Sequence, residues 1–119
     1  MYRLTLTCIV CAALVAGCNH DGRETSVDIR TVDYQCENSE TLQVKYVMPQ
    51  SGPSMATLAF QNKLVPMHQE RAASGVLYVA DKGQPGYRWH SKGDGGILQL
   101  QELGEIETAT VLKGCSAVE

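Results

Sequence analysis

Residues 41–60 read TLQVKYVMPQSGPSMATLAF, two alternating segments on either side of a turn. The first segment places three apolar side chains on one face: Leu42, Val44 and Tyr46. The second does the same with Ala56, Leu58 and Phe60. Apolar residues at every second position are typical of strands with one buried face. Residues 51–54 have the composition of a turn. The stretch therefore predicts two strands joined by a short loop.

Similar short segments continue along the rest of the chain. We expect further strands at 32–37, 64–67, 76–80, 87–90, 98–100 and 107–113, with 69–73 as strand or turn. Pro66 lacks a backbone N–H, so it predicts an edge strand or a bulge at 64–67. Glycine-containing segments separate several of these strands, and no segment shows a long helical period. About eight short strands in this order predict a small all-β fold, an antiparallel barrel or a sandwich.

Length and composition restrict the class of protein further. The chain has 119 residues, enough for one domain, with 44% hydrophobic and 19% charged residues. Its formal net charge is −3, so it lacks the basic surface that attracts nucleic acid. No phosphate-binding loop, G-x-S-x-G elbow or H-E-x-x-H pattern is present in the sequence. We therefore predict a binding protein without metal or cofactor, not an enzyme.

The N-terminus has the features of an export signal. Arg3 precedes an apolar run at 4–15, which is shorter than the ~20 residues that a membrane-spanning helix needs. The run ends in LVAGC at 14–18, which resembles the lipobox of bacterial lipoproteins and implies lipid on Cys18. An ordinary signal peptide cleaved near residues 16–17 is the alternative. We expect a signal peptide at 1–17, a lipidated Cys18 with a polar tether at 18–30, and a folded domain at 31–119.

Five cysteines divide between the signal and the domain. Cys8 and Cys11 have C-x-x-C spacing but lie inside the apolar run, which argues against a metal or redox motif. With Cys18 assigned to lipid, Cys36 and Cys115 remain near the two ends of the domain. Because exported proteins meet an oxidising environment, we expect a disulfide that joins the first and last strands. Two free thiols are the alternative.

Several short motifs together resemble one protein family along residues 34–115. They are Tyr34-Gln35-Cys36 followed by Leu42, Val44 and Tyr46; Ala56-Thr57-Leu58; Ala73-Ser74-Gly75-Val76-Leu77-Tyr78; Trp89-His90-Ser91-Lys92-Gly93 followed by Gly96 and Leu98; and Cys115. In this order, behind a lipobox-like cysteine, they resemble the MliC/PliC family of bacterial inhibitors of chicken-type (c-type) lysozyme. Gly96 stands where that family usually has Ala, and 82–86 forms a longer loop than the family pattern suggests.

The resemblance implies a fold, a partner and a mechanism. The fold is an eight-stranded antiparallel β-barrel with one disulfide, and the partner is c-type lysozyme. Two loops, at Ser74-Gly75 and Lys92-Gly93, would enter the lysozyme cleft. Apart from the resemblance, Tyr87 is a further candidate contact, because it could flank the Lys92 loop. Lys92 would supply a cation and Ser74 a hydroxyl to the two catalytic carboxyl groups. A bacterial envelope location follows, with Cys18 as membrane anchor; Asn19 after that cysteine, where an Asp would retain the protein at the inner membrane, favours the outer membrane.

From the residues alone, simpler interpretations remain for each of these positions. Ser74-Gly75 could be a turn before a strand, and Lys92-Gly93 an exposed loop. Tyr78 and Trp89 are better interpreted as core than as contacts, and His68 and His90 as surface or hydrogen-bonded histidines. At the level of the whole protein, the alternatives are a structural or small-ligand-binding envelope lipoprotein on the same barrel, and a hydrolase of envelope material that depends on Ser74.

Overall fold

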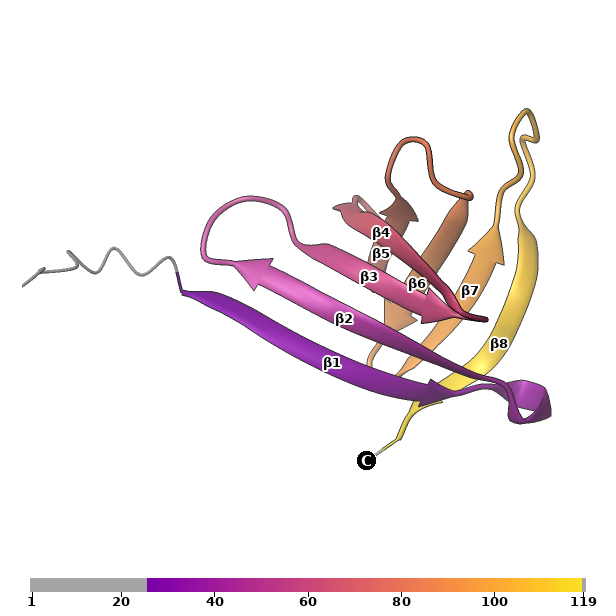
Figure 1. Ribbon diagram of the computed structural model, residues 1–119, viewed down its shortest axis with the longest axis horizontal. Coiled ribbons are helices and arrows are strands. Elements are labelled where there is room, and N and C mark those ends of the chain that lie inside the picture. The colour runs from indigo at the N-terminus through magenta and orange to yellow at the C-terminus, as the bar shows by residue number, and fades with distance from the viewer. Residues whose placement is uncertain (1–25, 119) are drawn as a thin grey trace, which may run out of the picture.

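The computed structural model describes residues 26–118 and contains a closed antiparallel barrel (Figure 1). Its elements are β1 (Val27–Gln35), the 3-10 helix η1 (Glu37–Ser39), β2 (Thr41–Pro49), β3 (Met55–Phe60), β4 (Lys63–Glu70), β5 (Val76–Ala80), β6 (Tyr87–Lys92), β7 (Gly95–Leu100) and β8 (Ala109–Ala117). Each strand pairs with the next, and β8 pairs with β1. The expected eight-stranded barrel is confirmed. The expected signal peptide and Cys18 lie outside the described residues.

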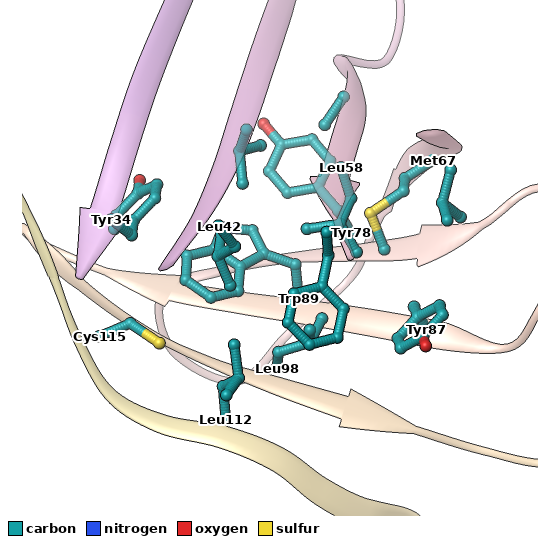
Figure 2. Close-up of a cluster of buried hydrophobic side chains, with 14 of the residues drawn as sticks. Tyr34, Leu42, Leu58, Met67, Tyr78, Tyr87, Trp89, Leu98, Leu112 and Cys115 are labelled. Atoms are coloured by element: carbon teal, nitrogen blue, oxygen red, sulfur yellow. The ribbon is translucent and has the colours of Figure 1, made fainter. Parts of the chain in front are cut away.

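Alternation along the strands fills the barrel with side chains. Trp89, Leu58, Val44 and Leu98 have no exposed surface, and they come from four different strands. Figure 2 shows Leu58, Leu98 and Tyr78 gathered with Trp89 inside the barrel. The burial of Trp89 and Tyr78 confirms both as core residues. An eight-stranded barrel has an interior that its own side chains can fill or that can hold one small ligand. Here the side chains at the centre form a packed core.

The few polar atoms in the core bond to one another. The Tyr34 and Tyr46 hydroxyls lie 2.7 Å apart, and Trp89 Nε1 donates to the Tyr46 hydroxyl over 2.9 Å. Burial, followed by the hydrogen bond to Tyr34, raises the pKa of Tyr46. Among the described residues no buried side-chain nitrogen or oxygen lacks a hydrogen-bond partner. The network gives these three buried polar side chains hydrogen-bond partners in place of water, which offsets the cost of burying them.

The barrel has two ends, which we name after a residue at each. At the Lys92 end, residues 50–54, 71–75 and 93–94 connect the strands. At the Tyr87 end, the connections are residues 36–40, 61–62, 81–86 and 101–108. Because neighbouring strands are antiparallel, loops that follow even-numbered strands gather at the Lys92 end.

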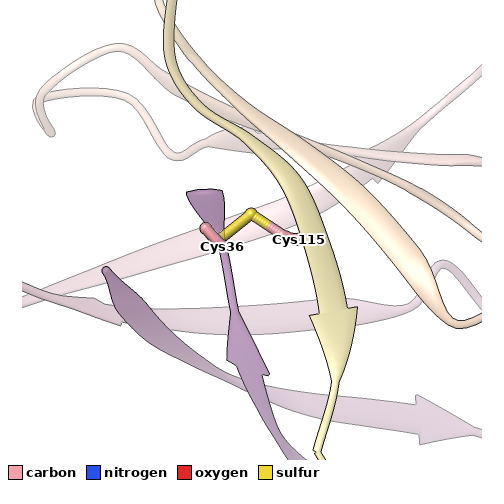
Figure 3. Close-up of a disulfide and its surroundings, with 2 residues drawn as sticks. All are labelled: Cys36 and Cys115. Atoms are coloured by element: carbon pink, nitrogen blue, oxygen red, sulfur yellow. A yellow bond between two sulfur atoms is a disulfide. The ribbon is translucent and has the colours of Figure 1, made fainter. Parts of the chain in front are cut away.

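The disulfide joins Cys36, directly after β1, to Cys115 in β8 (Figure 3). The two strands pair through Tyr34 with Ala117 and Gln35 with Ser116, and the cysteines continue this register. The expected bridge between the first and last strands is confirmed.

Strand boundaries differ from the expectation at both ends of the domain. β1 begins at Val27, so residues 27–30, expected in the tether, belong to the barrel. β8 extends to Ala117, past the expected 113, and Glu37, expected to end the first strand, begins a 3-10 helix over Glu37–Ser39. Within residues 26–118, no helix has the length and apolar character that crossing a membrane would require.

The expectation of an edge or bulge at Pro66 is wrong. Pro66 lies within β4, which pairs with β3 on one side and β5 on the other. The Pro66 carbonyl accepts a hydrogen bond of 2.9 Å from the Asp81 backbone N–H, just past the end of β5. In an antiparallel strand, the N–H and C=O of one residue point toward the same neighbouring strand. The Pro66 carbonyl points toward the end of β5, so the N–H that proline lacks would have pointed there too. The hydrogen bonds between β4 and β3 are therefore unaffected by the proline.

Candidate functional site

Lys92 closes β6 at a tight hairpin. It pairs with Gly95, so that Gly93 and Asp94 form a two-residue turn into β7. Gly93 has φ +59° at the first central position, where type II′ turns favour glycine. A side chain at Gly93 would meet nothing within 4 Å, so the tip of the turn is open. Successive side chains of a strand point to opposite faces. Trp89 points into the core, so Lys92, three positions later, points outward, and its side chain is exposed.

Ser74 and Gly75 end the loop between β4 and β5, and both are exposed. Gly75 has φ +67°, a conformation that other residues rarely adopt. A Cβ at Gly75 would overlap the Ser91 carbonyl oxygen and lie 3.4 Å from Lys92 Cβ. Glycine is therefore needed for both conformation and space. The close approach sets the Ser74 loop directly against the Lys92 hairpin, so the structure brings these two predicted loops together.

His90 links the two loops, which the sequence alone did not indicate. Its Nε2 lies 2.6 Å from the backbone carbonyl oxygen of Ser74. A carbonyl only accepts hydrogen bonds, so Nε2 carries the proton and donates. The signal that could have found this contact is the register, since Val76 pairs with Ser91 and Leu77 with His90. That pairing leaves Ser74 and Gly75 beside the last residues of β6.

Tyr87 is not part of this site, which corrects the expectation that it lies beside the Lys92 loop. It begins β6, whereas Lys92 ends it. Its side chain is buried, and its ring packs edge-on against Phe60 with ring centroids 6.1 Å apart. Figure 2 shows Tyr87 with the core residues. Over five strand positions the two residues are separated by about 17 Å.

The mouth of the barrel lies beside the Lys92 hairpin. A cavity of about 230 Å³ opens there between Gly93, Asp94 and Ser91 on one side and Arg30 and other β1 and β2 residues on the opposite side. The Ala117 backbone N–H donates to the Asp94 carbonyl over 2.8 Å, so the end of β8 is hydrogen-bonded to the hairpin turn. Among residues 26–118, the ion pairs involve His68 and Lys113, and Lys92 takes part in none.

These features define what the arrangement can do chemically. An unpaired ammonium group and a hydroxyl stand on adjacent loops at one edge of a rigid barrel, which suits them to bind carboxylates. The nearest histidine, His90, contacts the Ser74 carbonyl and not the Ser74 hydroxyl, so it does not form the serine–base pair that a hydrolase needs. Within the described part of the chain, no three His, Cys, Asp or Glu side chains gather as metal ligands.

Known proteins with similar sequences share one described activity. Residues 34–105 match the family described as membrane-bound lysozyme inhibitors of c-type lysozyme. A membrane-bound lysozyme inhibitor of C-type lysozyme from Cupriavidus necator is 32% identical over 91 residues, which cover 76% of this chain and 67% of that protein.

Two solved structures share the fold. PliC-St, the periplasmic inhibitor of C-type lysozyme from Salmonella typhimurium, has a TM-score of 0.65 and 27% identity, covering 77% of this chain and all of that chain. Pseudomonas aeruginosa MliC, crystallised in complex with hen egg white lysozyme, has a TM-score of 0.58 and 26% identity. That match covers 79% of this chain and 86% of the other.

Proposed function

Because this chain belongs to the family of membrane-bound lysozyme inhibitors of c-type lysozyme, we propose that it inhibits a c-type lysozyme by inserting its Ser74 and Lys92 loops into the active-site cleft. The observation that carries the proposal is the contact of Gly75 with Ser91 and Lys92, which holds both loops at one edge. Two separate loops would have to be ordered on binding, whereas two loops in contact are already arranged.

The chemistry of lysozyme fits this edge. A retaining glycosidase of this kind holds two carboxyl groups about 5 Å apart, one of them protonated at working pH. Lys92 would place its ammonium group beside that pair, and Ser74 would donate its hydroxyl to a carboxylate. The cation would also lower the pKa of the catalytic acid and so remove the proton that catalysis needs. Inhibition would therefore be both steric and electrostatic.

We place the protein in the bacterial envelope, facing the periplasm, as an inhibitor and not as an enzyme. Residues 1–17 would direct export and Cys18 would carry the lipid anchor, with the outer membrane favoured by Asn19. Two or more acyl chains give stable anchoring where one does not. The relatives described as membrane-bound and as periplasmic support this location.

Lys92→Ala tests the proposal most directly. Residues 19–119 would be expressed in the periplasm, so that Cys36 and Cys115 can pair, and assayed against hen egg-white lysozyme by cell-wall clearing. Removing one partner of a buried charge contact typically costs about 2–5 kcal/mol, so we expect inhibition to weaken roughly 30-fold to several thousand-fold. Lys82→Ala is the matched control, since Lys82 is also exposed but lies at the Tyr87 end.

The outcomes separate the function from the site. Inhibition that is strong in the parent and in Lys82→Ala, and lost in Lys92→Ala, would support both. Equal inhibition by all three proteins would keep the function and reject the Lys92 loop. No inhibition by the folded parent of any c-type lysozyme would reject the function itself.

A further inference from the structure

The outer face of β6 carries His90 and Lys92 side by side. Trp89 is buried in the core and Ser91 lines the mouth of the barrel, so the alternate residues His90 and Lys92 point outward. Two positions along a strand are separated by about 7 Å. A group that is hydrogen-bonded to the His90 side chain therefore lies close to the Lys92 side chain.

What His90 holds is the backbone of the Ser74 loop. Its Nε2 donates to the Ser74 carbonyl over 2.6 Å, and a Cβ on Gly75 would lie 3.2 Å from the same nitrogen. Outside the strand ladders, this is the one hydrogen bond that the structure of residues 26–118 gives to the loop at 71–75. The loop is exposed for most of its length, so burial does little to fix it.

From this geometry we infer that His90 is a positioning residue, which fixes the Ser74 hydroxyl beside Lys92 before lysozyme binds. The inference rests on the proposed function. His90 would not touch the enzyme; it would act through the loop that it holds. A loop fixed in its bound arrangement loses less conformational freedom on association, and this difference appears directly in affinity.

The bond does not require a charged histidine. A neutral ring with its proton on Nε2 donates as a protonated ring does. An amide nitrogen at the same distance from the backbone can therefore take over the role. Glutamine has such a nitrogen, so His90→Gln should keep the loop in place while His90→Ala releases it.

The first experiment measures inhibition constants for the exported protein against hen egg-white lysozyme. A single hydrogen bond and the ordering of a short loop correspond to a roughly two- to tenfold loss of affinity in His90→Ala. His90→Gln should recover most of that loss. Arg88→Ala is the matched control, because Arg88 lies on the same face of β6 but contacts Gln101 over 3.5 Å, away from the loop.

A double-mutant cycle with Ser74→Ala tests whether His90 acts through Ser74. If it positions the hydroxyl, His90→Ala should cost little once the hydroxyl is absent. An equal loss in both backgrounds would overturn the inference. So would an unchanged inhibition constant in His90→Ala while Lys92→Ala still abolishes inhibition.

Hydrogen exchange in the free protein gives a readout that needs no lysozyme. We expect His90→Ala, but neither His90→Gln nor Arg88→Ala, to accelerate exchange of the backbone amides at 74–76 several-fold. Unchanged exchange would overturn the inference whatever the inhibition assay shows. If exchange accelerates in His90→Ala while Lys92→Ala leaves inhibition unchanged, then His90 does position the Ser74 loop. In that case only the proposed lysozyme-binding site is rejected.

Discussion

Gly96 lies on the inner face of β7, against the indole of Trp89. A Cβ at this position would overlap two atoms of the Trp89 ring and press against a third at 3.0 Å. The ring is fully buried, and its nitrogen donates to the Tyr46 hydroxyl, so it cannot move aside without disturbing that bond. Glycine stands here where the resembled family usually has alanine. The structure gives the reason, since the Trp89 ring already occupies the space that an alanine methyl group would need.

Gly96→Ala should therefore destabilise the barrel. Adding a methyl group to a filled core typically costs about 1–3 kcal/mol, and we expect a loss of that size in the free energy of unfolding. Urea denaturation followed by the fluorescence of Trp89, the one tryptophan, measures it. Gly95→Ala is the control: its Cβ would meet only backbone oxygens, at 3.2 Å and beyond, so a smaller loss is expected. Equal losses in the two variants would contradict the explanation.

At the scale of the strands, the sequence predicted structure where one face is buried. β3 and the first six residues of β2 alternate cleanly because their inner residues lie in the core. The first half of β1 was missed because its inward positions lie beyond the core, where Arg30 lines the open mouth and Asp28 is exposed. Alternation indicates a strand only where burial selects apolar residues, so strand ends at an open mouth give little signal.

The candidate site was predictable to a similar extent. Ser74 and Lys92 came from family motifs, and their contact follows from the pairing of β5 with β6. Tyr87 was misplaced because it is close to Lys92 in sequence, although a full strand separates them. The His90 contact was missed because it follows from the register of β5 with β6, which the sequence analysis did not assign.

On the outer surface of β4, His68 lies between two carboxylates. Its Nδ1 is 2.7 Å from Asp81 Oδ1 and its Nε2 is 3.1 Å from Glu70 Oε1. Hydrogen bonds to Asp81 first, and then to Glu70, raise the pKa of His68 above its ordinary value of 6.5. Its cross-strand neighbours, Met55 and Val79, carry no charge. The folded state therefore favours the protonated imidazole.

This raised pKa predicts how stability depends on pH. The contribution of His68 is fully present below the unfolded-state pKa of about 6.5 and is lost as the pH rises through the higher folded-state pKa. His68→Gln should therefore flatten the fall in melting temperature as the pH rises above about 6.5, and Asp81→Asn should do so in part. Glu107→Gln, an exposed change in the β7–β8 connection, should leave the profile as it is. An unaltered profile in His68→Gln would contradict the prediction.

At the scale of the whole molecule, closure of the barrel depends on its shortest seam. β1 and β2 pair along nine positions each, from Val27 with Pro49 to Gln35 with Thr41. β1 and β8 pair through Tyr34 with Ala117 and Gln35 with Ser116, and the Val118 N–H donates one further hydrogen bond of 2.8 Å to the Asp33 carbonyl. The Cys36–Cys115 disulfide is located directly beside these two pairs, as Figure 3 shows. The bridge therefore reinforces the place where few hydrogen bonds hold the first strand to the last.

Removing this bridge should destabilise the protein and loosen that seam first. The cysteines are 79 positions apart, and closing a loop of that length in the unfolded chain corresponds to about 4–5 kcal/mol in the chain-entropy account. We expect the double variant Cys36→Ala with Cys115→Ala to lose an unfolding free energy approaching that value, and the parent to lose it under reducing conditions. Hydrogen exchange should accelerate most at the β1–β8 pairs and least between β3 and β4. Uniform acceleration along all strands would contradict this prediction. It would show that the disulfide acts only on the unfolded chain, and that the β1–β8 seam stays intact when the disulfide is removed.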